Sequence, residues 1–167
     1  MFTRFFKLCV PNVNDVINTT ANTAAPAPAV PAWDDTIPFV PPVTEGICIK
    51  AYDGDTITIA AKLPYPESPL YRFQVRLNGI DCPEIKGKSK EEKEVAQLAK
   101  KEVEELILGK KVQLKNVQTE KYGRILAEVY IDGINLNKHL VEKHLAVEYD
   151  GGSKHCPKSW TDYHNQL

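Results

Sequence analysis

The amino-acid sequence predicts an α+β fold: a five-stranded β-barrel of the oligonucleotide-binding (OB) type with two to three helices, preceded by a disordered tail. Three observations support this prediction. Apolar and polar residues alternate in five short segments after residue 45, which is the period of a half-buried strand. One longer segment has apolar residues at helical spacing. The first 45 residues hold 7 of the 12 prolines.

The strand patterns come as three segments, then two more after a helical segment. In the first segment Ile47 and Ile49 alternate with less apolar residues, and in the third Phe73, Val75 and Leu77 do the same. The expected strands lie at 47–50, 56–59, 72–77, 112–114 and 125–131.

The longest helix is expected at 92–108. Ser89 with Glu92 three residues later is the pattern of a capping box, and Gly109 is a helix-ending signal. The residues expected on its inward face are Val95, Leu98, Ala99, Val103, Leu106 and Ile107.

Two shorter helices complete the predicted set. One is expected at 136–143, after the turn residues Asp132 and Gly133, and another from Pro157. Helices inserted after the third and fifth strands suit a small, partly open barrel of the OB type. Such barrels bind their ligands along one face.

The chain changes in composition near residue 46. Residues 21–32 read ANTAAPAPAVPA, a Pro/Ala stretch that cannot build a core and is expected to be an extended spacer. We therefore expect a disordered tail and linker at 1–45 and a folded domain at 46–167.

The opening residues MFTRFFKLCV are only superficially similar to a secretory signal. Lys7 interrupts the apolar run and Pro11 ends it, so we expect an intracellular, cytoplasmic protein rather than a secreted one. Two interpretations stay open for this segment: a disordered tail with exposed phenylalanines, or a short membrane or partner anchor with an acylated Cys9.

Charge and cysteine content exclude some classes of protein. Lys and Arg number 21 against 22 Asp and Glu, so any nucleic-acid site must be local rather than a general basic excess. The four cysteines are scattered without a C-x-x-C pair, which favours reduced thiols. No apolar stretch approaches the length that spans a bilayer. We also expect the protein to be a monomer.

Charged residues interrupt the strand patterns at three places. The segment DGDT at 53–56 puts two carboxylates around a glycine; alone it is also typical of an ordinary turn. The segment RLNGIDCPE at 76–84 has an arginine and then two carboxylates three residues apart across a proline, and EKYGR at 120–124 has an arginine after a glycine turn. Together they supply carboxylates for a hard cation, one to activate water, and guanidinium groups for phosphate.

These three segments, with ILA after the last, resemble the staphylococcal nuclease family in order and in spacing. The resemblance covers residues 46 to about 149, and residues 135–137 and 140–141 add to it. It implies a Ca²⁺-dependent endonuclease that hydrolyses DNA and RNA without selecting the sugar. The family prefers single strands and leaves 3′-phosphate and 5′-hydroxyl ends.

Carried over residue by residue, the resemblance implies that Asp55, Asp81 and the backbone carbonyl of Cys82 bind Ca²⁺. His144 stands where the family usually has a glycine, and histidine adopts the left-handed backbone more readily than most residues. We therefore expect the fold to tolerate it.

The resemblance also implies that Glu84 is the general base and that Arg76 and Arg124 bind the phosphate. The residues that it places in contact with the substrate are Lys121, Tyr122 and Tyr149. The competing hypothesis is a catalytically silent OB-fold module that binds nucleic acid or protein, since such copies occur in this family. Silent copies usually lose the arginines or the carboxylates, and this chain keeps them.

Overall fold

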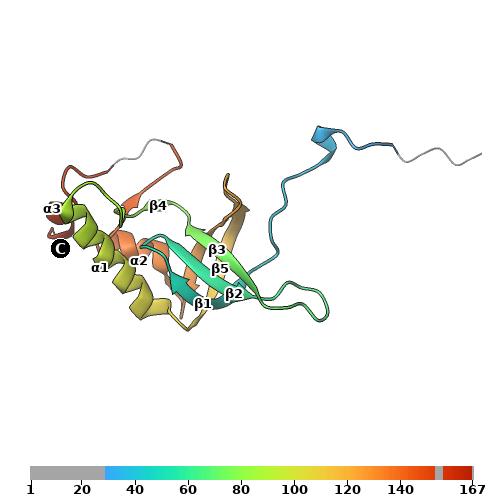
Figure 1. The fold of residues 1–167 in the computed structure, drawn as a ribbon, viewed down its shortest axis with the longest axis horizontal. Helices are drawn as coiled ribbons and strands as arrows, with labels where there is room; N and C mark the ends of the chain where they lie inside the picture. The colour runs from blue at the N-terminus through green and yellow to red at the C-terminus, as the bar shows by residue number, and fades with distance from the viewer. Residues whose placement is uncertain (1–28, 153–155, 167) are drawn as a thin grey trace, which may run out of the picture. The chain divides into compact units, whose positions relative to one another are not determined.

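The computed structural model describes residues 29–152 and 156–166, so most of the expected tail lies outside the described residues. The chain divides into two units, Met1–Thr36 and Ile37–Leu167. In the described part of the first unit, Trp33–Asp35 forms a 3₁₀ turn. The other described helices and strands belong to the second unit (Figure 1). The domain boundary near residue 46 stays a prediction.

Five strands of the second unit form a closed barrel, as predicted. Hydrogen bonds join them in the order β3-β2-β1-β5-β6, and a parallel pairing of β3 with β6, such as Val75 opposite Ile125, closes the ring. The barrel strands are β1 (Glu45–Ala51), β2 (Thr56–Ala61), β3 (Tyr71–Leu77), β5 (Lys111–Thr119) and β6 (Ile125–Ile131). The short strands are β4 (Ile80–Asp81), β7 (Ile134–Asn135) and β8 (Val147–Glu148).

The first strand presents a different face to the core from the one that its isoleucines suggest. Cys48 is fully buried, whereas Ile47 and Ile49 are 41% and 45% exposed. A Cβ on Gly46 would lie 2.9 Å from the carbonyl oxygen of Ala60, so the glycine allows β1 and β2 to approach closely. This contact and the irregular register after Cys48 are features that determine which residues of β1 face the core.

Helix α1 (Lys90–Ile107) packs on the barrel through residues spaced four apart. Leu98 was expected on this face, but it is 45% exposed and the prediction was wrong. With 3.6 residues per turn, position 98 falls outside the stripe that faces the barrel. The fully buried members of that stripe are Val95, Ala99, Val103 and Ile107.

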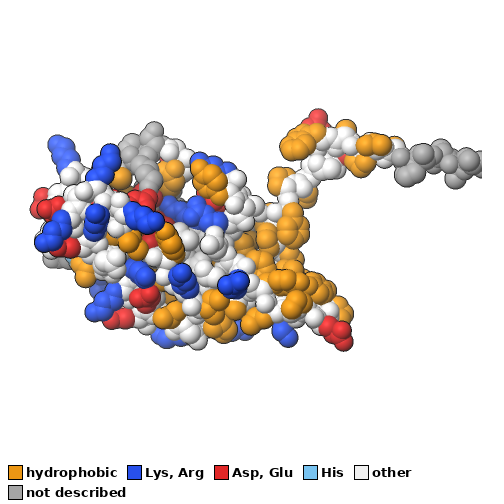
Figure 2. Space-filling model, viewed as in Figure 1, with side chains coloured by type: hydrophobic (Ala, Val, Ile, Leu, Met, Phe, Trp, Pro, Cys, Tyr) orange, Lys and Arg blue, Asp and Glu red, His pale blue; other side chains and the backbone are white. Residues whose placement is uncertain are grey.

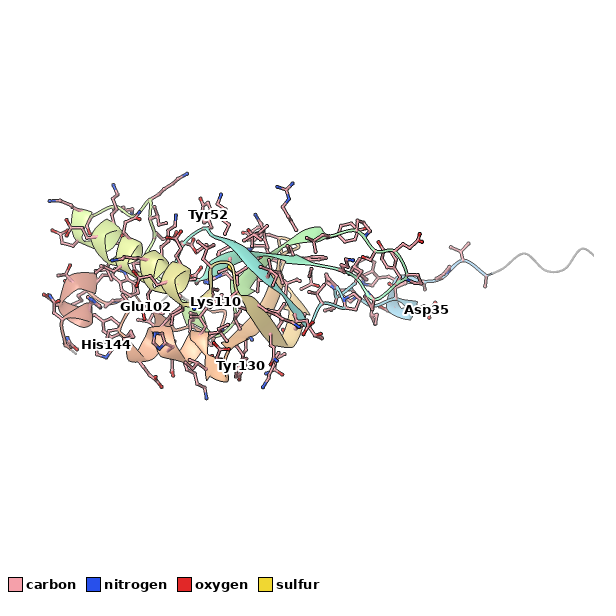
Figure 3. The ribbon with its side chains drawn as sticks, turned by 90° about the horizontal axis from the view of Figure 1, so that it is seen from below. Asp35, Tyr52, Glu102, Lys110, Tyr130 and His144 are labelled. Carbon is pink, nitrogen blue, oxygen red and sulfur yellow. The ribbon has the colours of Figure 1, made fainter. Side chains whose placement is uncertain are left out.

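Two short helices follow the barrel: α2 (Leu136–Glu142) and α3 (Trp160–His164). His144 follows α2 with φ of +49°, which confirms the expected left-handed conformation. The last helix starts three residues after the predicted Pro157, because Ser159 caps it by accepting a hydrogen bond from the Asp162 N–H at 3.1 Å. The helices lie next to one another in Figure 3, where Glu102 of α1 is labelled.

The described surface is uneven in composition. On the face drawn in Figure 2, Lys and Arg side chains gather over the end of the unit that carries α1. Hydrophobic side chains gather over the opposite end, where the β2–β3 connection exposes Tyr65 and Leu70 and the start of β3 exposes Tyr71. Among the described residues, no helix combines the length and the hydropathy needed to span a membrane.

Candidate active site

The β1–β2 turn and strand β3 meet because of the register of the barrel. Thr56 pairs with Arg76, and the Leu77 N–H donates to the carbonyl oxygen of Asp55 at 2.8 Å. The turn that carries Asp55 is marked by Tyr52 in Figure 3. The barrel therefore places a carboxylate from the turn beside an arginine from the strand.

Arg76 bridges two buried carboxylates. Its NH1 lies 2.6 Å from Oδ2 of Asp55, and its NH2 lies 3.0 Å from Oδ1 of Asp81. Asp55 and Asp81 are only 7% and 2% exposed, so this guanidinium is close to two acids held away from water. Asp81 belongs to β4, which pairs with β8 after helix α2. Two carboxylates from separate segments of the chain thus contact one guanidinium group.

Further hydrogen bonds fix the Asp55 carboxylate. Oδ2 accepts from the Cys82 N–H at 2.9 Å, and Oδ1 accepts from the Thr56 hydroxyl at 3.1 Å. Burial raises the pKa of Asp55 to about 6; Arg76 opposes this effect and nearby Asp53 adds to it. The carboxylate is therefore oriented, and its ionisation in the folded protein carries a cost.

Gly54 is required where the turn packs against the loop after β4. A Cβ at this position would lie 2.7 Å from Sγ of Cys82 and 2.8 Å from Cβ of Ala99. Both distances are shorter than real Cβ contacts, so a larger residue must push the turn outward. The glycine lets Asp55 reach the Cys82 backbone.

The donor set fits a hard cation better than a soft one. Burial, and then the neighbouring Asp55 carboxylate, raise the pKa of the Cys82 thiol well above its usual value, so the thiol stays protonated at neutral pH. Within residues 29–152 and 156–166, no cluster of three or more His, Cys, Asp or Glu side chains is arranged to hold a metal ion. Asp55 and Asp81 would thus be the side-chain ligands, with backbone carbonyl and water oxygens completing the shell, as Ca²⁺ accepts.

The second expected arginine, Arg124, lies on the β5–β6 turn. It forms a bidentate pair with Glu120, with Nε and NH2 each 2.9 Å from a carboxylate oxygen. The hydrogen bond to Glu120 is the main cause that raises the pKa of Arg124, and the charges of Asp55 and Asp53 add to it. No role for Glu120 was predicted from the sequence, although an acid four residues before an arginine, with Gly123 between them, indicates such a pair.

Glu84 lies three residues after Asp81, past the buried Pro83, and is exposed. Its N–H donates to Oε1 of Glu92, in the first turn of α1, at 3.3 Å. The proposed general base is therefore on a loop that follows the buried carboxylates directly and is tied to a helix.

A known protein family has a profile that matches the chain from within strand β3 to the end of helix α3. The profile described as staphylococcal nuclease homologue matches residues 74–165, more than half of the chain. The chain belongs to the staphylococcal nuclease family. The match contains Arg76, Asp81, Glu84 and Arg124, whereas Asp55 precedes it.

Several bacterial relatives in this family are named endonucleases. The chain is 30% identical over 106 residues to an uncharacterized endonuclease of Escherichia coli, covering 63% of this chain and 61% of that protein. It is 35% identical over 100 residues to endonuclease YncB of Bacillus subtilis, covering 58% and 44%. The SPbeta prophage-derived endonuclease YokF of Bacillus subtilis is 36% identical over 100 residues, covering 58% and 31%. The chain thus matches less than two thirds of each relative's length.

The residues that the family resemblance assigns to substrate binding fall in two places. Lys121 and Tyr122 lie on the Arg124 turn, where Tyr122 is 75% exposed and the Lys121 ammonium lies 4.9 Å from its ring centroid. Tyr149 is half-buried, and its hydroxyl donates to the Gly152 carbonyl at 3.1 Å. Tyr149 lines a cavity of about 780 Å³ beside α2, whose lining does not include the Arg76 cluster.

Proposed function

We propose that the protein is a Ca²⁺-dependent nuclease that hydrolyses phosphodiester bonds of DNA and RNA, prefers single strands, and leaves 3′-phosphate and 5′-hydroxyl ends. The observation that carries this proposal is the Arg76 bridge between buried Asp55 and Asp81. Oxygen ligands beside a guanidinium are the groups that metal-assisted hydrolysis of a phosphodiester requires. Membership of the family and the endonuclease names of the relatives support the reaction class.

The reaction divides among a small set of side chains. Bound Ca²⁺, held by Asp55, Asp81 and the Cys82 carbonyl, would supply a Lewis acid at a phosphate oxygen. Glu84 accepts a proton as water attacks phosphorus in line, the P–O5′ bond breaks, and its electron pair leaves on O5′, which takes a proton from solvent.

Two guanidinium groups stabilise the charge that builds on the phosphate during this attack. Arg76 lies on β3, and Arg124 directly precedes β6, the strand that pairs with β3 in parallel; each donates N–H groups to non-bridging oxygens. None of these steps uses a ribose 2′-hydroxyl, which is the reason to expect hydrolysis of both DNA and RNA. The exposed ring of Tyr122 is suited to an unpaired, flexible strand.

The deciding experiment is hydrolysis of a single-stranded oligonucleotide in Ca²⁺, in Mg²⁺ and in a chelator. We expect turnover in Ca²⁺, poor turnover in Mg²⁺, and none with the chelator, because a loose oxygen site tolerates the larger ion. End-group analysis should find 3′-phosphate and 5′-hydroxyl, and matched DNA and RNA oligonucleotides should both be cleaved.

Full activity in Mg²⁺ with none in Ca²⁺ would contradict the metal assignment. Binding of the oligonucleotide without cleavage under any of these conditions would instead support the silent binding module. The exposed Glu94→Gln variant is a suitable control, because it changes one surface charge of α1 outside the proposed site.

A further inference from the structure

The loop that carries Glu84 is held by one carboxylate of helix α1. Oε1 of Glu92 accepts a hydrogen bond from the Glu84 N–H at 3.3 Å, and Oε2 accepts one from the Lys88 N–H at 3.2 Å. The two bonds join both ends of the loop to the first helical turn. Glu92 is half-buried, whereas its neighbours Glu91 and Lys93 are exposed.

This arrangement departs from the capping box that Ser89 and Glu92 predict. The Ser89 hydroxyl accepts from the Glu92 N–H at 3.0 Å, as in such a box. The Glu92 carboxylate, however, reaches past the cap to the N–H groups of Lys88 and Glu84. Ser89 therefore caps the helix, while the Glu92 side chain serves the loop.

Gly87 closes the loop around this carboxylate. Its N–H donates to the Glu84 carbonyl oxygen at 2.8 Å, which forms a tight turn. A Cβ at position 87 would collide with the carboxyl group of Glu92 and lie 2.8 Å from the Glu84 carbonyl oxygen. The turn and the carboxylate thus occupy the space that a side chain at 87 would need.

Helix α1 provides a rigid base for these bonds. Its stripe of Val95, Ala99, Val103 and Ile107 is almost completely buried against the barrel. Close-packed side chains hold a helix in a fixed position. Because Glu92 belongs to this fixed helix, its two hydrogen bonds hold the loop in a fixed position relative to the barrel.

We infer that Glu92 is a positioning residue for the general base Glu84. The inference rests on the proposed function, since it assigns Glu92 a role through Glu84 rather than a contact with the substrate. A base must lie within hydrogen-bond reach of the attacking water, and a misplacement of about 1 Å costs on the order of 100-fold in rate.

The test compares Glu92→Ala and Glu92→Gln with two matched controls in the full chain. Ser89→Ala weakens the same helix end but leaves the carboxylate, and Glu94→Gln changes one exposed charge of the same helix. With a single-stranded DNA oligonucleotide and Ca²⁺, we expect Glu92→Ala to lower kcat about 10- to 100-fold at unchanged KM. Glu92→Gln should restore part of kcat, since its amide oxygen can still accept one bond. Both controls should keep the kcat of the parent chain.

A double-mutant cycle with Glu84→Gln separates positioning from general damage to the fold. If Glu92 acts through Glu84, Glu92→Ala should lower single-turnover rates little further once Glu84 is Gln. An equal loss in both backgrounds would overturn the inference, and so would an unchanged kcat in Glu92→Ala or an equal loss in Ser89→Ala. Parent-like turnover in Glu84→Gln alone would instead refute the proposed base, which is a separate failure.

Discussion

Arg76 resolves a conflict between two buried acids. Asp55 and Asp81 are both nearly inaccessible to water, and a buried carboxylate without compensation is costly. A guanidinium presents its nitrogens in a fixed planar fork, so one side chain can donate a hydrogen bond to Asp81 through NH2 and form an ion pair with Asp55 through NH1. The same planar group is the one that we propose binds the phosphate, so the proposed mechanism uses a side chain that also compensates the buried acids.

The first prediction concerns Arg76→Lys. The charge is retained, so the fold should persist, but one ammonium cannot take the place of a planar guanidinium that contacts both acids, and kcat/KM should fall at least about 100-fold. Steady-state kinetics on single-stranded DNA with Ca²⁺, together with a melting curve, measure both effects. Arg72→Lys, at an exposed position four residues earlier in the same strand, is the control. Parent-like kinetics in Arg76→Lys would contradict the bridging role of the guanidinium.

The second prediction is that Asp55→Asn stabilises the metal-free protein above pH 6. The folded pKa of about 6 lies above the ordinary value of 3.8 for an aspartate, so ionising Asp55 disfavours the folded state. This cost is absent below about pH 4, grows between 4 and 6, and is complete above 6, where it corresponds to about 3 kcal/mol.

Urea unfolding in a chelator measures this effect. The variant should exceed the parent in free energy of unfolding at pH 8, and the difference should shrink as the pH falls from 6 to 4. A variant less stable than the parent at pH 8 would show that Arg76 outweighs burial. Activity in Ca²⁺ should be lost in either case, because Asp55 is a proposed ligand.

Residue types in the site were predictable from the sequence, but the bonds between them were not. The segments DGDT and RLNGIDCPE identify Asp55, Arg76 and Asp81 as candidates, and the structure brings these three together. The pairs made by Glu120 and Glu92 depend on how a turn directs a carboxylate toward a guanidinium or a backbone N–H. Sequence spacing alone does not specify that direction.

At the scale of the elements, regular strands were predictable from the sequence, whereas features that depend on close backbone contacts were not. Strand β6 was predicted with the bounds that it has, because its alternation is regular and every second residue is buried. Strand β1 was predicted from the alternation of Ile47 and Ile49, but it buries Cys48 instead; a close approach at Gly46 and a register irregularity lie beside these residues. Close backbone contacts are tertiary features that local hydrophobicity does not report.

The third prediction, at the scale of the turn, concerns Gly54→Ala. The added methyl group would press on the Cys82 sulfur and on Ala99, so the turn must move and the free energy of unfolding should fall by about 1–3 kcal/mol. Because the move takes Asp55 away from the Cys82 N–H, the concentration of Ca²⁺ needed for half-maximal activity should rise. Gly152→Ala is the control, since the atoms of the described residues that a Cβ there would approach belong to the Asp150 carboxylate. An unchanged Ca²⁺ requirement would contradict this account of Gly54.

At the scale of the folded unit, closure of the barrel assembles the site from distant parts of the sequence. The β1–β2 turn supplies Asp55, the end of β3 supplies Arg76, and the β5–β6 turn supplies Arg124. The parallel pairing of β3 with β6 brings the two arginine-bearing segments to neighbouring strands. A barrel that opened between β3 and β6 would separate the two guanidinium groups that the proposed mechanism uses together.

The last prediction concerns the chain before the barrel. Removing residues 1–36 should leave melting temperature and nuclease kinetics unchanged, because the second unit begins at Ile37 and contains every proposed site residue. Removing residues 1–42 also takes away Phe39, whose carbonyl accepts a 2.8 Å hydrogen bond from the Thr119 hydroxyl, but it keeps the buried Val43. One such bond contributes about 1 kcal/mol, or about 2–4 °C in a unit of this size. We therefore expect this small decrease in the longer deletion alone, and unchanged kcat in both. A large decrease after removal of residues 1–36 would show that the first unit stabilises the barrel.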